Sequence, residues 1–168
     1  MRRLSRSHLG ALVIALAGAG CGFEAAAPPA PQAQVQPATE SRRVRKVIDG
    51  DTITVSGVGV VRLLGVDAPE KAGGYREAER FGDEATRFMR QLVDGKLVRL
   101  EYDGERTDQY NRTLAYVLLE DGTVANEAII RAGWAETYRR FTYRRKSQFQ
   151  AAEREAREAG RGMWSTKR

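Results

Sequence analysis

The chain has 168 residues, enough for one domain, and a formal net charge of +6 at pH 7. This charge favours a polyanionic partner such as nucleic acid or an anionic envelope surface, although a solvated basic surface explains the charge alone as well. Its one histidine, His8, and its one cysteine, Cys21, lie near the N-terminus, so the rest of the chain can hold no Ser-His-Asp or Cys-His catalytic group, no Cys/His zinc site and no disulfide. Acid–base chemistry there must use Asp, Glu, Lys, Arg or Tyr, and a bound metal should be a hard ion with oxygen ligands, such as Ca²⁺ or Mg²⁺.

The N-terminal residues have the order of an export signal. Arginines precede an apolar stretch at 9–17 that is too short to cross a bilayer, and small residues then lead to Cys21. We therefore expect residues 1–20 to be a signal peptide. The order resembles a bacterial lipoprotein signal, which implies lipid on Cys21 and a membrane anchor; ordinary cleavage near 25–27, with a soluble secreted product, is the alternative, and Cys21 as an incidental thiol is a third.

Residues 21–40 are rich in Ala, Pro and Gln and cannot bury enough apolar surface to offset chain entropy. We expect them to form a disordered linker between the anchor and a folded domain at 41–168. The protein is then exported, either to the cell envelope, where it would be lipid-anchored, periplasmic or on the surface, or into the medium.

The domain opens with β-branched, apolar segments that predict strands at 44–48, 51–55 and 58–66, joined by turns at 49–50 and 56–57. Three charged residues, Asp51, Arg62 and Asp67, interrupt this pattern. An unpaired charge in a sheet interior is costly. A hard cation beside the carboxylates and a phosphate beside the arginine would compensate all three.

The remaining pattern alternates strands with helices. A polar loop is expected at 71–80, then a helix at 83–93 capped by Asp83, with Ala85, Phe88, Met89, Leu92 and Val93 on its inner face. Strands are expected at 97–102 and 113–119, separated by a polar loop at 103–112, and further helices at 124–132 and 146–159. Between the last two helices, 138–146 interleaves aromatic residues with cations, and Trp164 is expected to pack back on the domain. The fold class is α+β: a five-stranded OB-fold β-barrel with three helices.

Four segments together carry a family resemblance: D-G-D-T at 49–52, R-L-L-G-V-D-A-P-E at 62–70, R-T-D-Q-Y-N-R-T-L-A-Y at 106–116 and N-E-A-I-I-R-A-G-W-A at 126–135. They closely resemble the thermonuclease (staphylococcal nuclease) family, over about 43–164. The resemblance implies an OB-fold barrel with three helices. It also implies Ca²⁺-dependent hydrolysis of phosphodiester bonds in DNA and RNA with little sequence preference, on single-stranded or unwound substrate, by a monomer.

The resemblance also assigns roles by motif position. Arg62 and Arg112 match the active-site arginines, and Glu70 matches the carboxylate that activates water. The calcium ligands would be Asp51, Asp67 and the backbone carbonyl of Ala68, where some members have threonine. Tyr110 matches a tyrosine near the phosphate, Tyr138 is the candidate for base stacking, and Asn111 replaces the usual glycine with a residue that tolerates left-handed backbone angles.

These residue types suit phosphodiester hydrolysis. Arginine offers a permanent charge and a planar fork that grips two phosphate oxygens, and two arginines with Ca²⁺ would stabilise the charge that develops in the transition state. Taken one at a time, each residue also fits an ordinary structural role, as a turn acid, a loop acid or an exposed cation. For 138–146, a solvated basic turn and a nucleic-acid groove are equally supported. Two other functions stay open: a non-catalytic nucleic-acid-binding OB module, and a structural lipoprotein whose basic face binds anionic envelope polymers.

Overall fold

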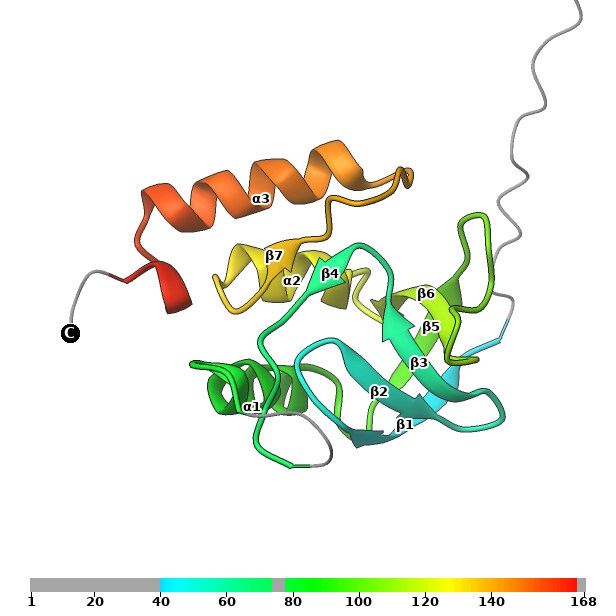
Figure 1. The fold of residues 1–168 in the computed structure, drawn as a ribbon. Coiled ribbons are helices and arrows are strands. Elements are labelled where there is room, and N and C mark those ends of the chain that lie inside the picture. The colour runs from blue at the N-terminus through cyan, green and yellow to red at the C-terminus, as the bar shows by residue number, and fades with distance from the viewer. Residues whose placement is uncertain (1–39, 74–77, 166–168) are drawn as a thin grey trace, which may run out of the picture. The chain divides into compact units, whose positions relative to one another are not determined.

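A computed structural model describes residues 40–73 and 78–165 (Figure 1). The predicted signal peptide, Cys21 and nearly all of the linker lie outside the described residues. Within those residues, no helix is both long enough and apolar enough to cross a membrane.

Five strands form a closed barrel in the order β1-β2-β3-β6-β5. All neighbours pair antiparallel except β3 and β6, which are parallel. Alternate apolar side chains fill the interior; Ile53, Val61 and Val117 have no exposed surface. The strands are β1 (Arg42–Val47), β2 (Thr52–Val55), β3 (Gly59–Leu63), β5 (Leu97–Glu101) and β6 (Thr113–Leu119).

Three helices accompany the barrel: α1 (Gly82–Val93), α2 (Ala125–Arg131) and α3 (Lys146–Glu158), followed by the 3-10 turn η1 (Gly162–Trp164). In Figure 1, α2 lies between α3 and the barrel, and it packs against both α1 and α3. The inner face of α1 is the one expected from helical spacing, since Ala85, Met89 and Val93 are fully buried. The predicted α+β class, with a five-stranded barrel and three helices, is confirmed.

The sequence predicted one continuous strand at 58–66, and this prediction is wrong. It breaks at Gly65, where φ is 79°, and the chain resumes as β4 (Val66–Asp67), paired with the unpredicted β7 (Glu136–Thr137). The ring of Tyr143 packs against the main chain at this break, where a Cβ at Gly65 would lie 2.6 Å from it. The Tyr143 hydroxyl also donates to the Gly65 carbonyl at 3.2 Å. The break turns β4 toward the functional residues described below.

The predicted cap of α1 is also wrong. Phe81, with φ of 73°, is the N-cap, and Asp83 lies inside the first turn, where its charge suits the helix dipole without capping it. The helix starts earlier because Gly82 packs against the main chain of Glu70: a Cβ at Gly82 would lie 2.1 Å from the Glu70 carbonyl oxygen. Trp164 packs back as expected, with the Arg157 guanidinium 3.6 Å from its ring centroid.

Candidate active site

Asp51 is the buried centre of the site. It lies just before β2, its side chain is 9% exposed, and its Oδ2 atom is 2.7 Å from Nη1 of Arg62 on β3. The strand register explains this meeting, since Thr52 is the partner of Arg62 across the β2–β3 ladder. The Thr52 hydroxyl and the Ala68 backbone N–H also donate to the carboxylate, each at 2.9 Å. Burial, helped by the neighbouring charge of Asp49, raises the pKa of Asp51 to about 7, although Arg62 and the Ala68 N–H lower it.

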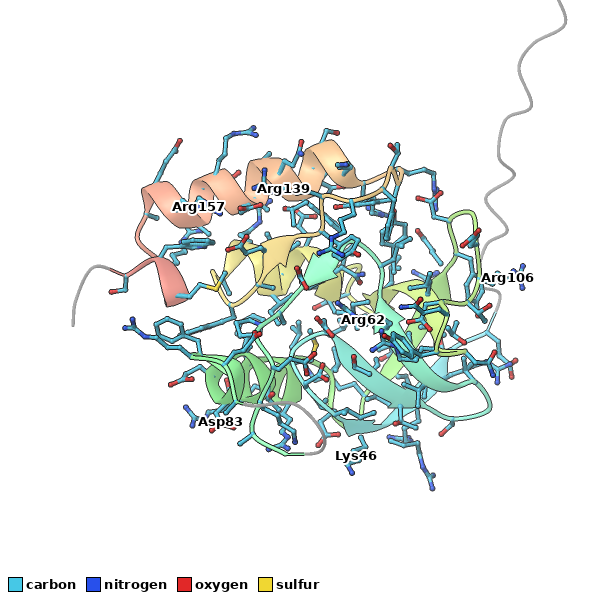
Figure 2. All side chains as sticks on the ribbon, viewed as in Figure 1. Lys46, Arg62, Asp83, Arg106, Arg139 and Arg157 are labelled. Atoms are coloured by element: carbon cyan, nitrogen blue, oxygen red, sulfur yellow. The ribbon has the colours of Figure 1, made fainter. Side chains whose placement is uncertain are left out.

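Arg62 joins Asp51 to Asp67. Its Nη2 atom is 3.7 Å from Oδ1 of Asp67, whose side chain is 60% exposed, and Nη1 also donates to the Val66 carbonyl at 2.8 Å. Figure 2 shows Arg62 where β3 gives way to β4. Two carboxylates, one just before β2 and one on β4, therefore converge on one cationic group.

The donor chemistry of this pair fits a hard cation. Two carboxylates already share one positive group, and carboxylate oxygens are the ligands that Ca²⁺ prefers. Among residues 40–73 and 78–165 no three His, Cys, Asp or Glu side chains converge, so backbone and water oxygens would have to complete a coordination shell. Ala68 is at the predicted place, but the contact seen is through its N–H rather than its carbonyl.

Arg112 is held by a loop that Asp108 organises. Asp108 Oδ1 accepts from the backbone N–H groups of Tyr110 and Arg112 at 3.0 and 2.9 Å, and Oδ2 binds Nε of Arg112 at 2.7 Å. Although burial raises the pKa of Asp108, these hydrogen bonds outweigh it and hold that pKa below its usual value. Asn111 adopts φ of 59°, as expected for the residue in place of glycine. The sequence pattern suggested Asp108 only as a neighbour of Arg112 in the loop and gave it no role in the site; its spacing of four residues before Arg112 was the available signal.

Tyr110 and Arg112 form the outer part of this loop. The Tyr110 ring is 65% exposed, and the Arg112 guanidinium lies 5.4 Å from its centroid. In the parallel β3–β6 ladder Arg62 is the partner of Leu114. Arg112 is two residues earlier, so the backbones of the two arginines are about 8 Å apart by strand geometry. The two arginines therefore lie on neighbouring segments of the chain, with Arg112 just before the start of β6.

Glu70 follows the site on the same segment as Ala68. It is half-buried, and it is only two residues from the Ala68 amide that contacts Asp51. Its own N–H donates to Oε2 of Glu79 at 3.1 Å, and its carbonyl accepts from the Glu79 N–H at 2.8 Å. The backbone of the predicted base is thus fixed by Glu79, two residues after the amide that contacts Asp51.

Tyr138 lies at the edge of the site, on the segment after β7. Its N–H donates to the Gly65 carbonyl at 3.0 Å, and its ring centroid is 4.9 Å from that of Phe141, which is 42% exposed. Most cations of 138–146 bind other groups of this domain, and Lys146 donates to two carbonyls of the same segment. The ion pairs are Arg139–Glu153 (2.8 Å), Arg144–Asp103 (3.4 Å) and Arg145–Glu101 (3.1 Å). The cations of this segment therefore mainly form ion pairs that hold the segment against the barrel and α3.

Comparison with known proteins decides the family. The model of the staphylococcal nuclease homologue family matches residues 60–166. The chain belongs to this family. It is 35% identical to the thermonuclease of Staphylococcus hyicus over 130 residues, which cover 75% of this chain and 76% of that protein. It is 43% identical to the thermonuclease of Staphylococcus intermedius over 100 residues, covering 55% and 60%. An uncharacterized endonuclease of Escherichia coli is 39% identical over 126 residues, covering 73% and 76%.

Proposed function

We propose that this member of the staphylococcal nuclease homologue family is a Ca²⁺-dependent nuclease, which hydrolyses phosphodiester bonds of DNA and RNA with little sequence preference and prefers single-stranded or unwound substrate. The observation that carries the proposal is the convergence of Asp51 and Asp67 on Arg62. Family membership and the names of the similar proteins support a nuclease. A binding module without catalysis would not need a buried carboxylate at this point.

The two arginines bind the substrate. Asp108 holds the Nε edge of Arg112, and among the described residues no other group accepts from this guanidinium, so its terminal nitrogens can grip a phosphate. Arg62 presents the second guanidinium from the neighbouring strand. Arg112 donates its terminal N–H groups to the non-bridging phosphate oxygens. Arg62, whose Nη1 is held by Asp51 and the Val66 carbonyl, adds its positive charge and the donors of Nη2, and both interactions strengthen as negative charge grows on the oxygens in the transition state. The exposed ring of Tyr110 lies beside the same phosphate.

Glu70 is the base in this proposal. Its carboxylate takes a proton from a water molecule whose oxygen attacks phosphorus, and the bond from phosphorus to one sugar oxygen then breaks. The leaving oxygen gains a proton from solvent. Asp51, Asp67 and the main chain at Ala68 would hold the Ca²⁺, which supplies positive charge next to the phosphate when bound.

Replacement of Glu70 by Gln tests this function. General-base catalysis contributes roughly 10²–10⁴-fold, so Glu70→Gln should lower kcat by that factor on single-stranded DNA in Ca²⁺ while KM changes little. Glu105→Gln, an exposed acid in the 103–112 loop, is the matched control and should retain full activity. Wild-type protein that binds DNA but does not cleave it with Ca²⁺ would instead establish the non-catalytic OB module, and equal cleavage in chelator would exclude the calcium requirement.

We also propose that the protein is exported and anchored through lipid on Cys21, with the linker holding the domain away from the membrane. Several acyl chains anchor stably, whereas one binds only marginally. Mass spectrometry of protein purified from membranes should find a lipidated N-terminal cysteine, and Cys21→Ser should release the protein. A mature N-terminus near 25–27 without lipid would mean a secreted nuclease.

A further inference from the structure

Glu79 holds Glu70 by two hydrogen bonds of opposite direction. The Glu79 N–H donates to the Glu70 carbonyl at 2.8 Å, and the Glu79 side chain turns back so that Oε2 accepts from the Glu70 N–H at 3.1 Å. Both main-chain polar groups of Glu70 are therefore bound by one other residue. The second bond has a carboxylate as acceptor, and such charge-assisted bonds are about twice as strong as neutral ones.

The start of α1 contacts both Glu79 and Glu70. The Gly82 N–H donates to the Glu79 carbonyl at 3.1 Å, and Gly82 lies so close to the Glu70 carbonyl that any Cβ would collide with it. Phe81 adopts a left-handed conformation between them, which costs about 1–3 kcal/mol for a non-glycine residue. Ala85 and Met89 of the same helix are fully buried in the core. Glu79 therefore connects Glu70 to a rigid element.

We propose that Glu79 is a positioning residue, whose carboxylate fixes the main chain of Glu70 so that the Glu70 side chain is aimed at the attacking water. This inference rests on the proposed function of Glu70. A catalytic group must be held within about 0.5 Å of its working position, and a misplacement of 1 Å can lower a rate by roughly 10²-fold. Glu79 itself is exposed, so its side chain is not required to fill the core.

Two substitutions of Glu79 separate the hydrogen bond from other roles. Glu79→Met keeps the length of the side chain but removes the acceptor, and it should lower kcat by about 10- to 100-fold with KM within about twofold. Glu79→Gln retains a carbonyl oxygen for the Glu70 N–H, so it should return kcat to within about threefold of wild type. Hydrogen exchange of the Glu70 amide, followed by NMR, should speed up in the Met variant and return toward wild type in the Gln variant.

Asp83→Ala is the matched control, because Asp83 is an exposed acid on the first turn of α1 and contributes nothing to the contact with Glu70; it should leave kcat and the Glu70 amide unchanged. In a Glu70→Gln background, Glu79→Met should cause no further loss of kcat, since there is no base left to position. A Met variant with normal kcat, or a Gln variant as slow as the Met variant, would overturn the inference while leaving the nuclease proposal intact. Full activity of Glu70→Gln alone would instead remove the proposed role of Glu70.

Discussion

Asp51→Asn should make the protein more stable at neutral and alkaline pH in the absence of Ca²⁺, although it removes a proposed metal ligand. Asparagine has the size of aspartate, and its carbonyl oxygen, in the place of Oδ2, can still accept from the Ala68 N–H, while its NH2 group, in the place of Oδ1, can donate to the Thr52 hydroxyl oxygen. It does not have to be ionised in a buried position. Arg62 keeps its contacts with Asp67 and the Val66 carbonyl.

The size of the effect follows from the pKa of Asp51, which burial raises from 3.8 to about 7. In the folded protein the carboxyl keeps its proton up to about pH 7, whereas in the unfolded chain it ionises near pH 4. The folded state thus binds more protons between these values, and the wild type loses stability as pH rises through this window. At about 1.4 kcal/mol per pKa unit the total is about 4 kcal/mol, of which about 3 kcal/mol develops between pH 4.5 and pH 8.

Urea unfolding in chelator measures this directly. The difference in unfolding free energy between Asp51→Asn and wild type should increase by about 3 kcal/mol from pH 4.5 to pH 8. Asp67→Asn is the control, because the Asp67 side chain is 60% exposed and its variant should show no comparable increase. Added Ca²⁺ should stabilise the wild type more than Asp51→Asn. If the stabilities of wild type and Asp51→Asn changed in parallel across this pH range, the raised pKa of a buried Asp51 would be refuted.

Three further results are expected. Arg62→Lys and Arg112→Lys should each lower kcat/KM by at least about tenfold, because lysine keeps the charge but loses the fork; near-normal rates in nuclease assays would mean that only charge matters. Glu153→Gln should destabilise the domain by about 3 kcal/mol at pH 7, since Glu153 is 2% exposed and binds Arg139 and Arg157. Burial raises the pKa of Glu153, but those partners and Thr137 hold that pKa below its usual 4.5. In urea titrations the loss of unfolding free energy in Glu153→Gln relative to wild type should therefore shrink as pH falls below about 4.5. A loss that stays constant with pH would contradict this. Gly65→Ala should lower stability by about 2–4 kcal/mol in thermal unfolding, because of its positive φ and the Tyr143 ring; an unchanged midpoint would show that Tyr143 moves aside.

Local patterns in the sequence were sufficient for the barrel and for the residues that interrupt it. The alternation of Val98 and Leu100 with Arg99 predicted β5, and helical spacing predicted the buried face of α1. Asp51, Arg62 and Asp67 stood out because charge is costly within apolar strands, and the structure brings these three together. Charge that contradicts a hydrophobic pattern was therefore the most informative local signal.

Contacts between residues distant in sequence could not be predicted in this way. At the break, Gly65 contacts Tyr143, 78 residues later, and the cations of 138–146 are bound by acids such as Asp103 and Glu153 from other elements. Composition alone made that segment resemble a free basic surface. Its partners are visible only once the barrel and α3 are in place.

Backbone strain shows where function outweighs local preference. Among the described residues, Phe81 and Asn111 are the non-glycine residues with positive φ. Asparagine tolerates this conformation, whereas for a bulky residue such as Phe81 it costs about 1–3 kcal/mol unless the surroundings compensate. Asn111 directly precedes Arg112, in the loop that Asp108 holds. Phe81 lies between Glu79 and Gly82, the two residues that fix the main chain of Glu70. The two left-handed positions thus hold segments next to Arg112 and next to the proposed base, Glu70, while the buried carboxyl group of Asp51 supports the proposed metal site. Phe81 and Asp51 both cost stability, which the apolar core of the barrel and helices must offset.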